Sequence, residues 1–114
     1  MPDLNSIRNR LMKESRQMRL GHLAADLLRI SNFIENGSAN EAKPIFRESK
    51  WFAEWIAPGS DLRTQQLLAD AQSFLAYQEL DWSNWTAKAE SMTTTATTIR
   101  IWSNELLKQS GLVG

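Results

Sequence analysis

Apolar and small residues in the last third of the chain recur at alternating steps of four and three. This spacing keeps one side of a helix turned toward a neighbour, and small members of the stripe let that neighbour come close. The pattern predicts one long helix, capped by Asp81 or Ser83 and ending at Ser110-Gly111, with another helix lying along it. The stripe consists of Trp85, Ala89, Met92, Ala96, Ile99, Ser103 and Leu106.

Two helical patterns share the N-terminal part of the chain. Residues 4–18 carry one apolar side, and residues 20–34 carry another that is rotated from the first by about 140°. Gly21 lies at the changeover and is a weak helix former. We therefore expect a first long helix that is kinked or broken near Gly21. The second pattern ends at Asn36-Gly37, a usual pair for a left-handed cap.

Prolines set the predicted limits of the third helix. Pro44 is tolerated in the first turn of a helix, where its missing N–H costs nothing, so the helix is expected to start near Lys43. It is expected to stop at Ala57, because Pro58-Gly59 cannot continue it.

A fourth helix is expected from a cap at Ser60 or Asp61 to about Glu79. The predicted turns are short, and short turns place consecutive helices antiparallel and adjacent. The predicted fold is all-α, an up-and-down bundle of four or five helices in one domain, residues 1–114. Its core is expected to contain an aromatic layer of Phe46, Phe52, Trp55 and Phe74.

The composition is that of an ordinary globular protein, with 42% hydrophobic and 23% charged residues. Thirteen basic and thirteen acidic residues cancel, and there is no cysteine for a disulfide, a thiolate zinc site or a thiol nucleophile. The N-terminus lacks the apolar core of a secretory signal, and no run approaches a membrane span. These features predict a cytoplasmic protein.

Enzyme motifs are missing from the sequence. His22 is the one histidine, which excludes the paired Glu-x-x-His motifs of di-iron bundles, and no glycine-rich loop is present to hold phosphate. A serine acting with His22 stays an alternative, although a partly exposed structural histidine is the favoured interpretation. We predict a non-enzymatic chain with no catalytic, cofactor-binding or metal-binding residues.

Charge is unevenly distributed along the chain. Residues 1–30 hold six basic and three acidic residues, whereas residues 61–90 hold two basic and five acidic ones. The basic amphipathic helix at residues 4–19 is typical of surfaces that meet acidic partners or membranes. Arg8, Arg10 and Arg16 are therefore candidate interaction residues, and peripheral membrane contact stays open. The alternative, which we favour, is that they face the acidic fourth helix or solvent; no nucleic-acid motif is visible.

Five tryptophans are many for 114 residues. Helical periodicity explains most of them as core residues, and an aromatic platform for a partner is the alternative. The candidate platform residues are Trp51, Trp55, Trp82 and Trp102.

Two stretches, LGHLAADLLRISNF (20–33) and ESKWFAEWIAPG (48–59), resemble small helical proteins of cyanobacteria that have no known activity. The resemblance implies a cytoplasmic protein and supplies no functional residue.

The predicted function is protein–protein interaction or an adaptor role, with a protein partner or a homodimer. The homodimer interface is expected on part of 82–106 or on 51–56. The alternative is a carrier for a small apolar ligand or pigment. A cavity above about 300 Å³ lined by tryptophan favours the carrier, whereas a flat exposed apolar patch favours the adaptor.

Overall fold

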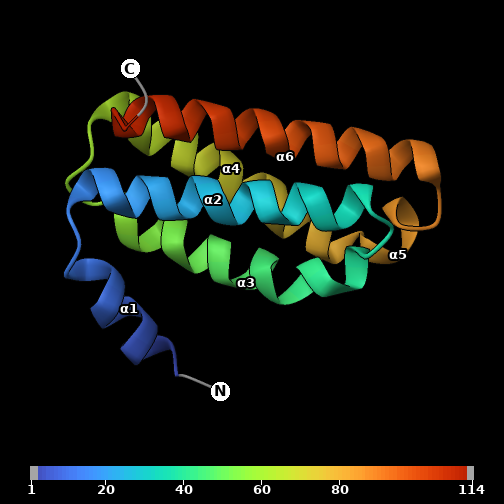
Figure 1. The fold of residues 1–114 in the computed structure, drawn as a ribbon, viewed down its shortest axis with the longest axis horizontal. Helices are drawn as coiled ribbons and strands as arrows, with labels where there is room; N and C mark the ends of the chain where they lie inside the picture. Colours follow the sequence, from blue (N-terminus) through green and yellow to red (C-terminus); the bar gives the residue numbers. More distant parts are fainter. Residues whose placement is uncertain (1–2, 113–114) are drawn as a thin grey trace.

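The computed structural model describes residues 3–112, which form six helices and no strand (Figure 1). The chain is therefore all-α, as the sequence predicts. The helices are α1 (Leu4–Met12), α2 (Arg16–Glu35), α3 (Ala39–Ile56), α4 (Leu62–Leu80), α5 (Trp82–Trp85) and α6 (Ala89–Ser110).

The four long helices run alternately up and down the bundle (Figure 1). α2 packs between α3 and α6, and α4 closes the ring by packing on both α3 and α6. α5 covers the end where α4 passes to α6, and α1 is set at an angle at the opposite end. The predicted up-and-down bundle is confirmed, with two short helices added to four long ones within residues 3–112.

The most extensive contact between two helices is that of α2 with α6. Ser31 Oγ donates a hydrogen bond to the carbonyl oxygen of Ala96 at 2.5 Å, and Ser103 Oγ donates to the carbonyl oxygen of Ala24 at 2.6 Å. These four residues are buried. A serine hydroxyl reaches a neighbouring helix backbone only where small residues let the two helices approach, so the small positions of the stripe act as predicted.

The N-terminal end of that stripe differs from the prediction. Trp85 belongs to α5, and α6 begins at Ala89, which is exposed, so the single long helix from residue 81 or 83 is wrong. Trp85 is buried, but within α6 the stripe is buried only from Ala96 onward. The Trp85 indole Nε1–H donates to the Gln78 carbonyl oxygen in α4 at 2.8 Å, and its ring lies 4.9 Å from that of Trp82. These contacts hold Trp85 to the end of α4, so the chain must turn again before α6.

The break in the first helical region is real but lies at Lys13–Ser15, and the prediction of a break near Gly21 is wrong. Ser15 caps α2 by accepting the N–H of Met18 at 3.2 Å. The Arg19 side chain donates to two carbonyl oxygens at the α1–α2 connection, both at 2.9 Å. Backbone groups freed by the break are thus satisfied here, whereas Gly21 continues a regular helix.

α3 begins at Ala39, four residues before the predicted start at Lys43. Pro44 therefore lies in the second turn, where its missing N–H leaves the Asn40 carbonyl oxygen without its helical donor. Both Pro44 and Asn40 are exposed, so water can supply that hydrogen bond. The helix tolerates the proline because the lost bond faces solvent.

The other predicted helix ends are confirmed. α2 ends at Glu35, with Gly37 at φ 78° in the left-handed region that glycine favours. α3 ends at Ile56, and Asp61 caps α4 by accepting the N–H of Thr64 at 2.8 Å. α6 ends at Ser110 and is followed by Gly111, as the sequence predicts.

The aromatic side chains form two clusters instead of the single predicted layer. In the first, the ring centroid of Phe46 lies 5.2 Å from that of Trp82 and 6.1 Å from that of Trp85. All three residues are buried, so two of the tryptophans are core residues. The second cluster consists of Trp51, Phe52 and Trp55, while Phe74 is half-buried against the core.

Candidate functional site

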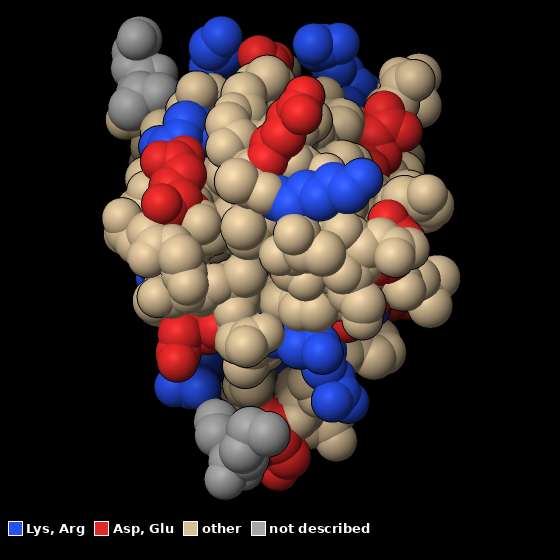
Figure 2. Space-filling view, turned by 90° about the vertical axis from the view of Figure 1, so that its right-hand side faces the viewer, with Lys and Arg blue, Asp and Glu red and all other residues tan. Residues whose placement is uncertain are grey.

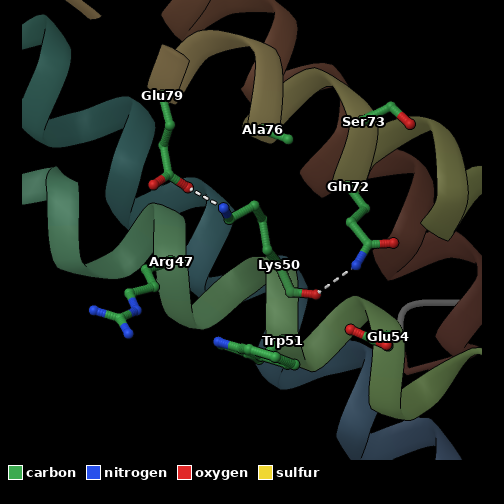
Figure 3. Close-up of a pocket in the computed structure, with 8 residues that line it drawn as sticks. All are labelled: Arg47, Lys50, Trp51, Glu54, Gln72, Ser73, Ala76 and Glu79. Atoms are coloured by element: carbon green, nitrogen blue, oxygen red, sulfur yellow. Dashed lines mark hydrogen bonds and ion pairs between the residues drawn. The ribbon is translucent and has the colours of Figure 1, made fainter.

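A groove of about 660 Å³ lies between α3 and α4 (Figure 3). It is open to solvent, and its lining combines polar side chains with apolar surface. α3 contributes Arg47, Lys50, Trp51 and Glu54, and α4 contributes Gln72, Ser73, Ala76 and Glu79.

The packing of both helices explains why a groove forms here. α3 turns its buried side, including Phe46, Ser49 and Ala53, into the core, which leaves the polar residues between them at the surface. On α4 the wall of the groove contains Ser73 and Ala76, which are too small to fill the space between the two helices.

Polar contacts join the two walls of the groove. Lys50 Nζ lies 2.8 Å from Glu79 Oε1, and Gln72 Nε2–H donates to the Lys50 carbonyl oxygen at 3.2 Å (Figure 3). The Lys50 and Glu79 side chains are about three-quarters buried. These contacts fix the spacing of α3 and α4, so the groove is a built feature of the bundle.

A tryptophan pair borders the groove on α3. The rings of Trp51 and Trp55 stack with centroids 6.0 Å apart and an interplanar angle of 24°, and both are half-buried. Arg47 and Glu54, one turn to either side of Trp51, are exposed, and no ion pair joins them to other described residues. Trp51 therefore presents an aromatic face flanked by one free positive and one free negative charge.

α4 exposes large apolar side chains along its outer side, from its first residue to the end that lines the groove. Leu62 is 80% exposed, Tyr77 63% and Leu80 90%. Single exposed apolar residues are common, whereas a contiguous exposed apolar patch indicates a partner site; Tyr77 and Leu80 lie one turn apart on α4, so their side chains can share one patch. We call the groove, the Trp51–Trp55 pair and this outer side of α4 the α3–α4 face.

A smaller cleft of about 240 Å³ lies where α1 meets α2 and α3. His22 Nε2 lies 2.7 Å from Glu14 Oε2, and Asp26 and Glu48 line the same cleft. Burial, and then the nearby Glu48 carboxylate, raise the pKa of Asp26 to about 6. His22 is half-exposed and pairs with Glu14 beside the α1–α2 connection, so the cluster joins α1 to the bundle.

The basic residues of the N-terminal region have separate surroundings. Arg8 and Arg10 are exposed on α1, and Arg10 also lines the smaller cleft. Arg16 Nη2 lies 3.5 Å from Asp61 Oδ2 at the start of α4. The favoured interpretation, in which these residues face the fourth helix or solvent, matches the position of all three.

The remaining candidate tryptophans do not join the α3–α4 face. Trp82 is buried against Phe46, with Lys43 Nζ 5.1 Å from its ring centroid. Trp102 lies half-buried on α6, diagonally across the bundle from α3. Of the predicted interaction residues, Trp51 lines the groove between α3 and α4 and Trp55 stacks on it, while Arg10 lines the smaller cleft.

The end of the bundle near α5 carries charges of both signs. Figure 2 shows blue and red side chains interspersed there among uncharged ones, without a field of one sign. None of the helices in residues 3–112 is long and apolar enough to cross a membrane. No group of three or more His, Asp or Glu side chains in the same residues is placed to hold a metal ion.

Comparison with protein-family models, curated proteins and solved structures gave no match. The resemblance to small cyanobacterial helical proteins therefore stays a prediction.

Proposed function

We propose that this chain is a non-enzymatic protein-interaction domain whose partner binds the α3–α4 face. The observation that carries the proposal is the exposure of large apolar side chains beside a groove of fixed shape. Tryptophan and tyrosine contribute a large share of binding energy in protein interfaces. Here Trp51 and Tyr77 lie on adjacent helices that border the same groove.

The interior of the bundle supports the same choice of surface. The long stripe of α6 is buried against α2, so most apolar side chains of 82–106 pack inside the bundle; Ile101, which is 56% exposed, is an exception. The 51–56 region keeps two half-buried tryptophans at the surface. Of the two interfaces expected from the sequence, 51–56 is therefore the one we retain.

The carrier alternative has one observation in its favour. The groove exceeds about 300 Å³, the volume expected for a ligand site, and is lined by Trp51. Six of its eight lining residues are polar or charged, however, and an apolar ligand would have to cover Lys50 and Glu79 without replacing their hydration. Mixed charges around an aromatic face suit a peptide surface better.

A photo-crosslinking experiment tests the interaction function. A benzophenone side chain is introduced at Ser73, which is exposed in the groove, and at Ala25, exposed on α2, as the control. In an extract of the source cells we expect a discrete product from the Ser73 position that is absent from the Ala25 position. Excess unlabelled wild-type protein should compete the product away.

Two competitor variants make that result specific. Arg47→Glu alters the exposed edge of the groove and should compete poorly, whereas Lys108→Glu, exposed on α6, should compete as wild type does. Equal products from both positions, or full competition by Arg47→Glu, would rule out the α3–α4 face as the binding surface. A Trp51 fluorescence change with apolar dyes and no crosslinked protein would favour the carrier.

A further inference from the structure

The outer side of α4 carries its own seven-residue repeat, separate from the buried side of the same helix. Its members follow at steps of four and three, the spacing that keeps a stripe facing a second helix. All are exposed except Ala76, which is half-buried. The stripe consists of Leu62, Gln66, Ala69, Ser73, Ala76 and Leu80.

The order of large and small residues in this stripe is nearly the same in both directions. A leucine stands at each end, and the three small residues lie between them. When two copies of α4 run antiparallel, Leu62 meets Leu80 of the second copy, and Ala69 meets Ser73 of the second copy. Every large residue then finds an apolar partner, and the small residues let the two helices come close.

Residues flanking the stripe are chemically matched in the same arrangement. Antiparallel packing brings Arg63 beside Tyr77 of the second copy, where a guanidinium can lie over an aromatic ring. It also brings Gln65 to the level of Glu79 of the second copy, but Glu79 is held in its ion pair with Lys50, so this pair adds no contact across the interface. Antiparallel helices align opposite dipole ends, which parallel ones do not. One pair is unfavourable, because Asp70 faces Asp70 of the second copy.

We propose that the partner of the α3–α4 face is a second copy of this chain, docked through antiparallel α4 helices around a two-fold axis level with residue 71. The inference rests on the proposed interaction function and names its partner. Because each copy offers the same patch, the contact closes on itself and stops at two chains. α3 lies beside α4, so the Trp51 side of the groove borders the same contact.

The size of the contact sets its strength. α4 has 19 residues, a length of about 28 Å, and one helix pair with its borders belongs among the small interfaces. We expect a dissociation constant of about 1–100 µM. The facing Asp70 residues weaken the dimer at low ionic strength, so added salt should strengthen association, opposite to the usual effect on attractive ion pairs.

Analytical ultracentrifugation of the purified chain tests the dimer. The chain has a mass of 13.0 kDa, and we expect the mean mass to rise with concentration and to approach twice this value well above about 100 µM. Leu80→Glu should weaken the dimer at least about tenfold, and Asp70→Asn should strengthen it. Ile101→Glu on α6 is the matched control, since Ile101 is also exposed, and should leave the dimer unchanged. A monomer at every concentration, or equal loss from the Leu80 and Ile101 variants, overturns the proposal.

The absence of native cysteine allows the orientation to be tested separately. Ala69→Cys and Ser73→Cys chains are mixed and oxidised, with Ala25→Cys as an exposed control. Antiparallel docking predicts a mixed disulfide between the Ala69 and Ser73 variants. Preferential disulfides within each variant indicate parallel helices and overturn the antiparallel arrangement. If the chain is monomeric but Ser73 still crosslinks a different protein, the second-copy inference fails while the interaction function stands.

Discussion

Ala96→Leu is the substitution that probes the α2–α6 contact most sharply. Ala96 is 1% exposed, and its carbonyl oxygen accepts the hydrogen bond from Ser31. A leucine here would push α6 away from α2, because the small residue is what lets the two backbones approach. The Ser103–Ala24 hydrogen bond, two turns further along α6, depends on the same spacing.

The magnitude follows from these contacts. Overpacking of a tight core site costs about 1–3 kcal/mol. Loss or stretching of two buried hydrogen bonds adds about 0.5–1.5 kcal/mol each. We therefore expect the free energy of unfolding to fall by about 2–6 kcal/mol. In a domain of this size that corresponds to a decrease in Tm of about 8–24 °C.

Thermal unfolding followed by circular dichroism, together with urea unfolding, measures this loss. Ala25→Leu, on the exposed side of α2, is the control and should change the free energy of unfolding by less than about 0.5 kcal/mol. If Ala96→Leu melts within about one degree of wild type, the close α2–α6 packing described above is wrong.

Three further substitutions have distinct expected outcomes. Trp85→Ala should lower the free energy of unfolding by about 3–5 kcal/mol in urea, because it removes a buried ring that packs on Phe46; a loss below about 1 kcal/mol would show that α5 is not part of the core. Asp26→Asn should stabilise the protein at pH 7 by about 1–2 kcal/mol, because the pKa of Asp26 is raised from 3.8 to about 6 and the folded state loses stability as pH rises through this interval. The gain in stability from Asp26→Asn should disappear near pH 4, and a gain that is independent of pH would refute the raised pKa of Asp26. Gly21→Ala should raise Tm, because alanine has the better helix propensity. The new Cβ would lie 2.7 Å from Leu112 Cδ1, so the flexible Leu112 side chain must shift. A lower Tm would show that Leu112 is fixed there.

Local sequence signals were sufficient to predict most helix ends. Asp61, the Pro58-Gly59 pair and Gly37 each act through their own backbone or side chain, so no distant contact is needed to interpret them. Ser15 is a signal of the same kind that the prediction overlooked in favour of Gly21. A serine cap can satisfy a freed N–H, whereas a single glycine only weakens a helix that packing can still hold.

Features that depend on distant residues were not predictable in the same way. The turn between α5 and α6 results from Trp85 bonding to Gln78 and packing on Phe46, neither of which the repeat spacing can reveal. Among the candidate residues, Trp51 and Trp55 were named as part of an aromatic platform only as the alternative to the favoured core interpretation, and the groove beside Trp51 was not predicted. It exists because Lys50 and Glu79 meet across two helices, and single-helix patterns do not specify such pairs.

The most direct test of the α3–α4 face is the amide and indole NMR spectrum of the chain at concentrations from about 10 µM to 1 mM. We expect the indole N–H signal of Trp51 and the amide signals of residues 62–80 to shift with concentration, because these groups lie in or beside the contact. The indole signals of Trp82 and Trp85, buried at the end of the bundle, should stay in place. A spectrum that does not change over this range, or changes centred on α6, would contradict docking through the α3–α4 face.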